Sequence, residues 1–310
     1  MIKLLSFLVA LLLPFTAFAA TFSDVGSDHA DYTAIGYFAQ EGFVGGYPDG
    51  SFQPEKSINR VEALKIILNI LGVDATSYDA LATKDFPDMQ SEDWFYPFVQ
   101  FAVQRGIVSG TDAGELQPGR IVNQAEFFKL LFEAHGLYTS RRGEVAGVPA
   151  SAWFAPYVHL ADQTRLIADG TIEPGHQLTR GEVVAMGYQF LQRKNVILTQ
   201  ANLNEAEDYV LDALGLLGTQ QIDKAVSVAT AAVAAAQTAK DRLPTHEATD
   251  MAYNIAMAVQ HLAIAQTVPF VDQQAHVGQG QSYLNLLRDT SGELSGTAAL
   301  IEAALAALDA

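Results

Sequence analysis

The chain of 310 residues carries 18 Lys and Arg against 35 Asp and Glu, a formal net charge of −17. This balance argues against a nucleic-acid partner, because phosphate binding requires a basic surface. The chain has no cysteine, which excludes disulfides and thiol nucleophiles, and its 49% apolar residues suffice for one large or two ordinary domains.

The first twenty residues have the features of a secretory signal peptide. Lys3 precedes an apolar run that ends in small residues, and we expect cleavage at about Ala19 or Ala20. An uncleaved membrane anchor is the alternative, but Pro14 and the polar sequence that follows leave the run short for a spanning helix. Residues 1–20 are therefore predicted to direct export.

Two helices around a turn-rich loop are predicted next, within residues 21–74. An apolar helical face ends at Gly42, which supplies a left-handed residue, and Pro-Asp-Gly at 48–50 predicts a turn. The second helix begins at Asn59. Its side chain can accept from the amide of Glu62 while the Glu62 side chain reaches back, which is a reciprocal capping arrangement.

The same pattern recurs at an offset of 64 residues and again in a shorter third copy, where Arg165 takes the place of the helix-ending glycine. Two short helices cannot bury an apolar face alone, so the units are expected to pack into one body. The second and third repeats are predicted over residues 85–138 and 147–194, with the capping pairs Asn123 with Glu126 and Thr179 with Glu182.

Three motifs of the first copy are "FSDV" from residue 22, "GFVGGYPDGSFQP" from residue 42 and "INRVE" from residue 58. They resemble the repeat of the S-layer homology (SLH) domain family, over residues 22–192 in all, although Ala30 stands where that family usually has Trp. The resemblance implies three helix-loop-helix repeats in a spindle with pseudo-threefold symmetry. It also implies that grooves between the repeats bind cell-wall polysaccharide, which often carries anionic pyruvyl groups.

Arg60 and Arg180 are candidate ligand-binding residues at the first position of the second helices. A cation there is unfavourable by about 0.3 to 1 kcal/mol, and an anionic ligand at the same helix terminus would offset that cost. The alternative is a structural ion pair with an acidic residue of a neighbouring repeat, such as Asp24 or Asp88. Gln124 takes this position in the second copy, and a neutral amide predicts a weakened or empty groove.

Aromatic and glycine residues complete the candidate polysaccharide site. Trp94 and Trp153 occupy the Trp position of the family, where an exposed indole could stack on a sugar ring; the alternative is a core residue at a helix start. Gly46, Gly50 and Gly110 would let the loop backbone approach a ligand closely, and loop chirality alone is an equally good explanation.

Residues 196–310 have an Ala-, Gln-, Thr- and Leu-rich composition with few charges. Breaks at Gly218, Pro244, Pro269 and residues 290–293 divide this part into helices. Short connections between long helices imply antiparallel neighbours, so we predict a four- or five-helix bundle.

No catalytic or metal-ligating constellation is recognised in this part. His246, His261 and His276 recur every fifteen residues, which does not place two ligands on one helical face, so scattered structural or surface histidines are expected. The acidic cluster at residues 205–208 is expected to be a solvated first helical turn, where negative charge suits the helix end.

We therefore predict a mainly α, non-catalytic, exported protein without metal or cofactor. It would be held on the cell wall by a secondary cell-wall polymer or a peptidoglycan-linked glycan. The C-terminal helices would contact further copies or other surface proteins. The alternatives are an SLH-tethered enzyme acting on the wall and a self-assembling S-layer structural protein.

Overall fold

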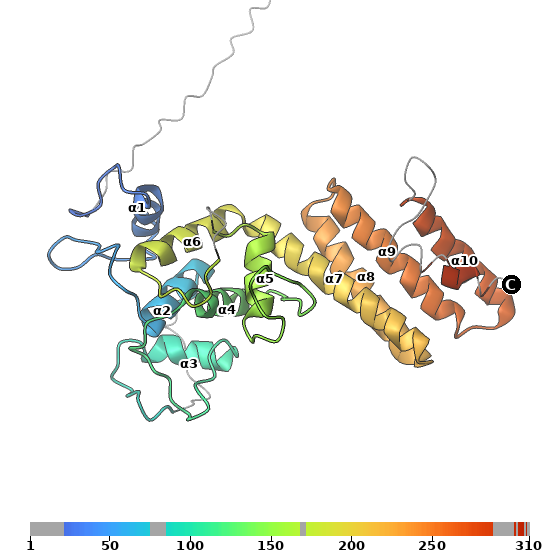
Figure 1. Ribbon diagram of the computed structural model, residues 1–310, viewed down its shortest axis with the longest axis horizontal. Coiled ribbons are helices and arrows are strands. Elements are labelled where there is room, and N and C mark those ends of the chain that lie inside the picture. The colour runs from blue at the N-terminus through green and yellow to red at the C-terminus, as the bar shows by residue number, and fades with distance from the viewer. Residues whose placement is uncertain are drawn as a thin grey trace, which may run out of the picture.

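The computed structural model describes residues 22–74, 85–167 and 172–287, together with 301, 303–306 and 308. The predicted signal peptide and the predicted break at residues 290–293 lie outside the described residues. Within them the chain forms helices joined by loops, and its only β-type pairing is three isolated bridges. The predicted mainly α fold is confirmed: three helix pairs lie at one end and four long helices at the other (Figure 1).

Each helix pair consists of a short helix and a second, capped helix. At the start of every second helix the N-cap side chain accepts from the backbone amide three residues on, and the Glu there accepts from the N-cap amide. The pairs are α1 (Tyr32–Gln40) with α2 (Arg60–Leu71), α3 (Tyr96–Gln104) with α4 (Gln124–Ala134), and α5 (Ala155–Gln163) with α6 (Arg180–Gln192).

A closed ring of backbone hydrogen bonds joins the three pairs just before their second helices. The amide of Ile58 donates to the carbonyl of Leu178 at 3.0 Å, Leu178 donates to Val122 at 3.0 Å, and Val122 donates to Ile58 at 3.1 Å. All three side chains are buried. The three strand-like entries therefore surround one pseudo-threefold axis, and each satisfies the backbone of the next.

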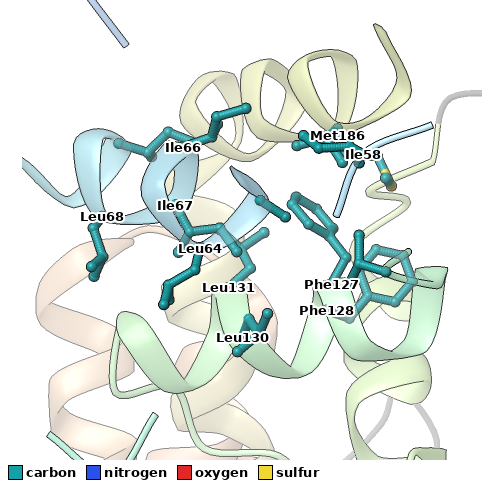
Figure 2. Close-up of a cluster of buried hydrophobic side chains, with 14 of the residues drawn as sticks. Ile58, Leu64, Ile66, Ile67, Leu68, Phe127, Phe128, Leu130, Leu131 and Met186 are labelled. Atoms are coloured by element: carbon teal, nitrogen blue, oxygen red, sulfur yellow. The ribbon is translucent and has the colours of Figure 1, made fainter. Parts of the chain in front are cut away.

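The apolar faces of the second helices meet beneath this ring. Phe127 and Phe128 of α4 lie against residues of α2, and Met186 reaches in from α6 (Figure 2). Buried residues three or four positions apart lie on one face of each helix, as do Leu64, Ile67 and Leu68 of α2 and Phe127, Leu130 and Leu131 of α4. Figure 2 labels the α2 contributors Leu64, Ile66, Ile67 and Leu68.

The helix-ending turn keeps the same backbone conformation in all three pairs. Gly42 has φ 72° and Gly106 has φ 74°, and Arg165 adopts φ 49° at the corresponding position of the third copy. For a non-glycine residue this left-handed conformation costs about 1–2 kcal/mol. The Arg193 side chain donates to the Arg165 carbonyl at 2.7 Å, which helps hold the turn.

The remaining long helices form an antiparallel bundle whose buried faces are rich in alanine. The predicted breaks at Gly218, Pro244 and Pro269 all lie at or between helix ends. Only Arg193 separates α6 from the first bundle helix, so the change of composition near residue 195 falls inside that helix. The bundle helices are α7 (Lys194–Gly218), α8 (Ile222–Arg242), α9 (Glu247–Ala265) and α10 (Phe270–Asn285).

A buried carboxylate on α7 ties the bundle to the segment after α4. Asp208 is 6% exposed and accepts from the Tyr138 hydroxyl at 2.8 Å and the Ser140 hydroxyl at 3.0 Å. The Arg142 Nε lies 3.2 Å from the same carboxylate. The prediction of a solvated first turn at residues 205–208 was wrong for Asp208, because α7 begins at Lys194 and places this residue mid-helix.

Candidate functional site

A groove lies where the loop of the first repeat meets residues of both other repeats. Its volume is about 430 Å³, and we call it groove A. The ring of backbone bonds places Arg180 of the third repeat over this loop. Groove A is lined by residues 42–47, by Glu62, Lys65, Ile66 and Asn69 of α2, and by Trp94 and Arg180.

Arg180 is buried against the loop without an acidic partner. Its Nε donates to the Phe52 carbonyl and its Nη2 to the Gly45 carbonyl, both at 3.1 Å. The guanidinium also lies 4.6 Å from the centre of the Phe52 ring and 5.1 Å from that of Tyr47. No salt bridge to Arg180 occurs within the described part of the chain. Its positive charge at groove A is therefore not neutralised by a carboxylate.

The acidic residues proposed as alternative partners of the arginines bind the backbone instead. Asp24 accepts from the amides of Phe52 and Gln53, each at 2.7 Å. Asp88 accepts from Leu116 and Gln117 in the same way, at 2.9 and 2.7 Å. These bonds hold Gln53 and Gln117 in the left-handed conformation, with φ 57° and 56°.

Trp94 of the second repeat also lines groove A and is 52% exposed. Its ring meets Phe95 edge-on, with centroids 5.5 Å apart, and the Lys65 ammonium lies 5.4 Å from its centre. Trp153 of the third repeat is 55% exposed and meets Phe154 in the same edge-on manner. Neither tryptophan is a core residue, so both indoles present a face to solvent.

The three predicted glycines are explained by the structure of their loops, two of them by close packing and one by its backbone conformation. A Cβ at Gly46 would lie 2.5 Å from the Phe22 ring, and one at Gly110 would lie 2.6 Å from Phe86. Gly50 has φ 81°, and a Cβ there would have no neighbour within 4 Å, so only its backbone conformation requires glycine. Gly46 lines groove A, whereas Gly50 is not among its lining residues.

The second repeat carries a corresponding set of residues with a different charge balance. Arg60 takes the place of Arg180, and burial lowers its pKa while Glu126 opposes that shift. Its Nε is buried and has no hydrogen-bond partner within the described residues. Lys129 corresponds to Lys65, but its ammonium is paired with Glu133 at 3.0 Å.

The third repeat has a groove of about 530 Å³ in which the cationic and aromatic positions are replaced; we call it groove C. Gln124 stands for the arginine and is 6% exposed, with its Oε1 accepting from the Glu173 amide at 2.8 Å. Ala185 stands for Lys65 and Ala30 for Trp94. Groove C therefore lacks the three side chains that groove A combines.

The acidic residues of groove C disfavour a further anion. Burial raises the pKa of Asp31, and the nearby carboxylates of Glu182 and Glu55 raise it further, while His29 lowers it. Asp31 and Glu182 both line the groove. An anionic ligand would meet two carboxyl groups here and no cation among the described lining residues, whereas groove A has one carboxyl group, that of Glu62, together with a guanidinium and an ammonium.

Sequence reasoning identified Arg180, Trp94 and Gly46 but missed Lys65. A signal was present, since Lys65 and Lys129 correspond in the first two copies and each lies three residues after a capping Glu, on the same helical face. Tyr47 and Asn69 were also missed. Their roles depend on the packing of the loop against α2, which no local pattern encodes.

Neither a metal centre nor a membrane span emerges from the described residues. They contain no group of three or more His, Cys, Asp or Glu side chains that could hold a metal ion. Among the helices they form, none has both the length and the apolar composition needed to cross a membrane.

Comparison with known proteins gives the following relatives. The chain is similar to Cell surface glycoprotein 1 of Acetivibrio thermocellus, with 28% identity over 167 residues, which are 49% of this chain and 7% of that protein. It is 33% identical over 138 residues to S-layer protein sap of Bacillus anthracis, covering 44% of this chain and 16% of that protein. It is 24% identical over 163 residues to the Cellulosome-anchoring protein of Acetivibrio thermocellus, covering 49% and 36%.

The chain thus spans well under two thirds of each of these relatives. A model of the S-layer homology domain matches residues 21–64 and 85–128. These two segments include the loop of groove A, the capped starts of α2 and α4, and Trp94. The chain therefore contains two S-layer homology domain segments, at residues 21–64 and 85–128.

Proposed function

We propose that this chain is a non-catalytic, exported protein that attaches to the cell envelope by non-covalent binding of cell-wall polysaccharide, with groove A as its main site. The observation that carries this proposal is the combination, in one groove, of the unneutralised Arg180, the Lys65 ammonium and the exposed Trp94 indole. The names of the relatives, an S-layer protein and an anchoring protein among them, support attachment to the envelope.

The chemistry of groove A favours an anionic sugar, such as a pyruvylated residue. A guanidinium has five N–H donors, and the carbonyls of Phe52 and Gly45 use two of those of Arg180. The remaining donors and the Lys65 ammonium would bind a carboxylate, with charge-assisted bonds worth about 1.5–3 kcal/mol each. The Trp94 ring would supply an apolar face for the sugar.

Residues 147–194 are proposed as a third repeat of the same kind. Support comes from the backbone ring that includes Leu178, from the capping pair of Thr179 and Glu182, and from the left-handed turn at Arg165. On this reading the third repeat supplies Arg180 to groove A but, in groove C, no cationic site of its own.

Long-range attraction contributes little to this binding. Residues 21–195 carry 22 acidic and 13 basic side chains, so the repeats are negative overall. The contacts must therefore be local, and a repeating polymer that engages more than one chain or groove would add avidity to weak single sites.

Co-sedimentation with purified cell wall tests the proposal. We expect the mature protein to pellet with intact wall and to remain in solution after the wall is stripped of its secondary polysaccharide. Lys65→Ala and Trp94→Ala should each weaken pelleting at least several-fold, and Arg180→Ala more. Lys224→Ala, which removes an exposed ammonium from α8, is the control and should bind normally.

Folding is monitored for each variant by circular dichroism, because Arg180 is buried and its replacement removes two hydrogen bonds to the loop. Lys65 and Trp94 are exposed, so their replacements separate binding from stability. Equal pelleting of all variants, or undiminished pelleting on stripped wall, would overturn polysaccharide binding at groove A.

A further inference from the structure

Two histidines on neighbouring helices of the bundle, fifteen residues apart in the sequence, face each other. His261 lies on α9 and His276 on α10, and their Nδ1 atoms are 3.0 Å apart. The ring centres are 5.3 Å apart, so the two nitrogens lie between the rings and point at each other. The sequence predicted scattered histidines; the turn between α9 and α10 brings this pair together.

Only one proton fits between these nitrogens. With both rings neutral, one Nδ1–H donates and the other Nδ1 accepts. A first added proton can leave this bond in place. When both rings carry a proton on Nδ1, two donors and two positive charges face each other at the same distance, and the bond is lost.

The pair lies in a closely packed part of the α9–α10 contact. The Tyr283 ring stacks on His261 with centroids 5.8 Å apart. A Cβ at Gly280 would lie 2.8 Å from Leu305 and 3.5 Å from the Cβ of His261, so α10 approaches both α9 and the described part of the C-terminal segment. Displacing α10 would uncover the buried Val277 and Leu284.

No carboxylate within the described residues is positioned to compensate a second positive charge. The other titratable group against the pair is Tyr283 of α10. The ring of Tyr253 on α9 lies beyond it, with its centre 6.4 Å from that of Tyr283. Lys240 of α8 lies over the Tyr253 ring and is itself paired with Asp250 at 2.9 Å. Neither imidazole has an ion pair in that part of the chain, unlike His29 and His176.

We propose that the His261–His276 pair is an acid-sensitive latch that holds α10 on α9 at neutral pH and releases it when both rings are protonated. Release presents the apolar face of α10, at Val277 and Leu284, to solvent. This device is independent of polysaccharide binding by the repeats.

The direction of the pH dependence follows from the burial of His261. Burial lowers its pKa, and the neighbouring His276 lowers it further. The unfolded chain therefore binds a proton more readily, from about pH 6.5 downward. The contact is fully stable above that pH and weakens as the pH falls.

Distance measurement between two spin labels tests the latch in the full mature chain. The chain has no cysteine, so Met251→Cys on α9 and Gln279→Cys on α10, both exposed positions, provide unique attachment sites. We expect a narrow distance distribution at about pH 7.5 that broadens and shifts to longer values at about pH 5, with its midpoint below about 6.5.

Two further variants identify the groups responsible. His276→Leu leaves a single imidazole and should keep the narrow distribution at both pH values. His246→Gln removes an exposed histidine at the start of α9 and should behave like the parent. An unchanged distribution in the parent between the two pH values would overturn the proposal, as would equal broadening in folded His276→Leu. If His276→Leu is broad already at neutral pH, His261→Phe, which retains the stacking on Tyr283, takes its place.

Discussion

Lys65 and Trp94 belong to different repeats, yet the Lys65 ammonium lies 5.4 Å from the centre of the Trp94 indole. A cation over an aromatic face contributes about 0.5–1 kcal/mol at an exposed site. This contact orients both side chains in groove A. The N–H donors of the Lys65 ammonium are not taken up by a carboxylate of the described residues and stay available to a ligand. The corresponding Lys129 is instead bound to Glu133.

This difference predicts unequal roles for the two lysines. Lys65→Ala should weaken wall binding by about five- to tenfold, since it removes a free ammonium worth about 1 kcal/mol or more. Lys129→Ala should weaken it less than twofold, because that charge is already neutralised. Binding isotherms with purified wall polymer measure both, and equal losses would contradict the assignment of groove A as the main site.

Asp208 predicts a strong stability effect at the junction of repeats and bundle. Asp208→Ala leaves the hydroxyls of Tyr138 and Ser140 without their acceptor and removes one of the two carboxylates that Arg142 contacts, which should cost about 2–4 kcal/mol in the free energy of unfolding. Urea unfolding measures the loss. Asp212→Ala is the matched control, since its carboxylate on the same helix is exposed and its pair with Arg142 should contribute less than about 1 kcal/mol.

Asp24 predicts a pH-dependent contribution of the first loop. Burial alone would raise the pKa of Asp24, but hydrogen bonds from the Phe52 and Gln53 amides lower it below its usual value. A carboxylate with a lowered folded-state pKa stabilises the fold above the unfolded value of about 3.9, and the contribution disappears as the pH falls below it.

Asp24→Asn, which loses one of the two acceptors, should therefore destabilise the protein by about 1 kcal/mol at neutral pH, a modest value because the group is exposed. Thermal unfolding of both proteins across the acid range checks this. A difference that stays constant from neutral pH to about pH 2.5 would show that the charge of Asp24 is irrelevant.

Close packing at Gly187 of α6, against both α1 and α2, predicts a destabilising effect of a larger residue. A Cβ there would lie 2.8 Å from Ile70 and 2.9 Å from Phe38, so Gly187→Ala should lower the free energy of unfolding by about 1–3 kcal/mol. Gly215 of α7 has no atom within 4 Å of the same position, and Gly215→Ala should raise stability by about 0.5–1 kcal/mol. Chemical denaturation measures the free energy of unfolding of both variants, which should change in opposite directions. A stabilising effect of Gly187→Ala would contradict the close contact.

The local features of this fold could be predicted from the sequence, because they depend on single glycine or proline residues or on residues three or four apart. The capping pair of Asn59 and Glu62 and the helix ends at Gly42 and Pro244 are of this kind. The start of α7 was misplaced because the acidic cluster at residues 205–208 was interpreted as a first helical turn. The helix begins at Lys194, so Asp208 lies mid-helix and is buried.

Long-range features required the structure. Arg180 and Trp94 were both identified as candidates, but which loop they share with Lys65 depends on the order in which the three repeats pair around the axis. The His261–His276 contact was missed because residue spacing shows only which side chains share a face of one helix, whereas this pair forms between two antiparallel helices.

The circular hydrogen bonding of Ile58, Val122 and Leu178 sets this protein apart from open solenoids, in which units can be added or removed at an end. A closed circle has no end. Excising any one unit would strand an amide on one neighbour and a carbonyl on the other, both in a buried position, so truncation should abolish the whole assembly instead of shortening it.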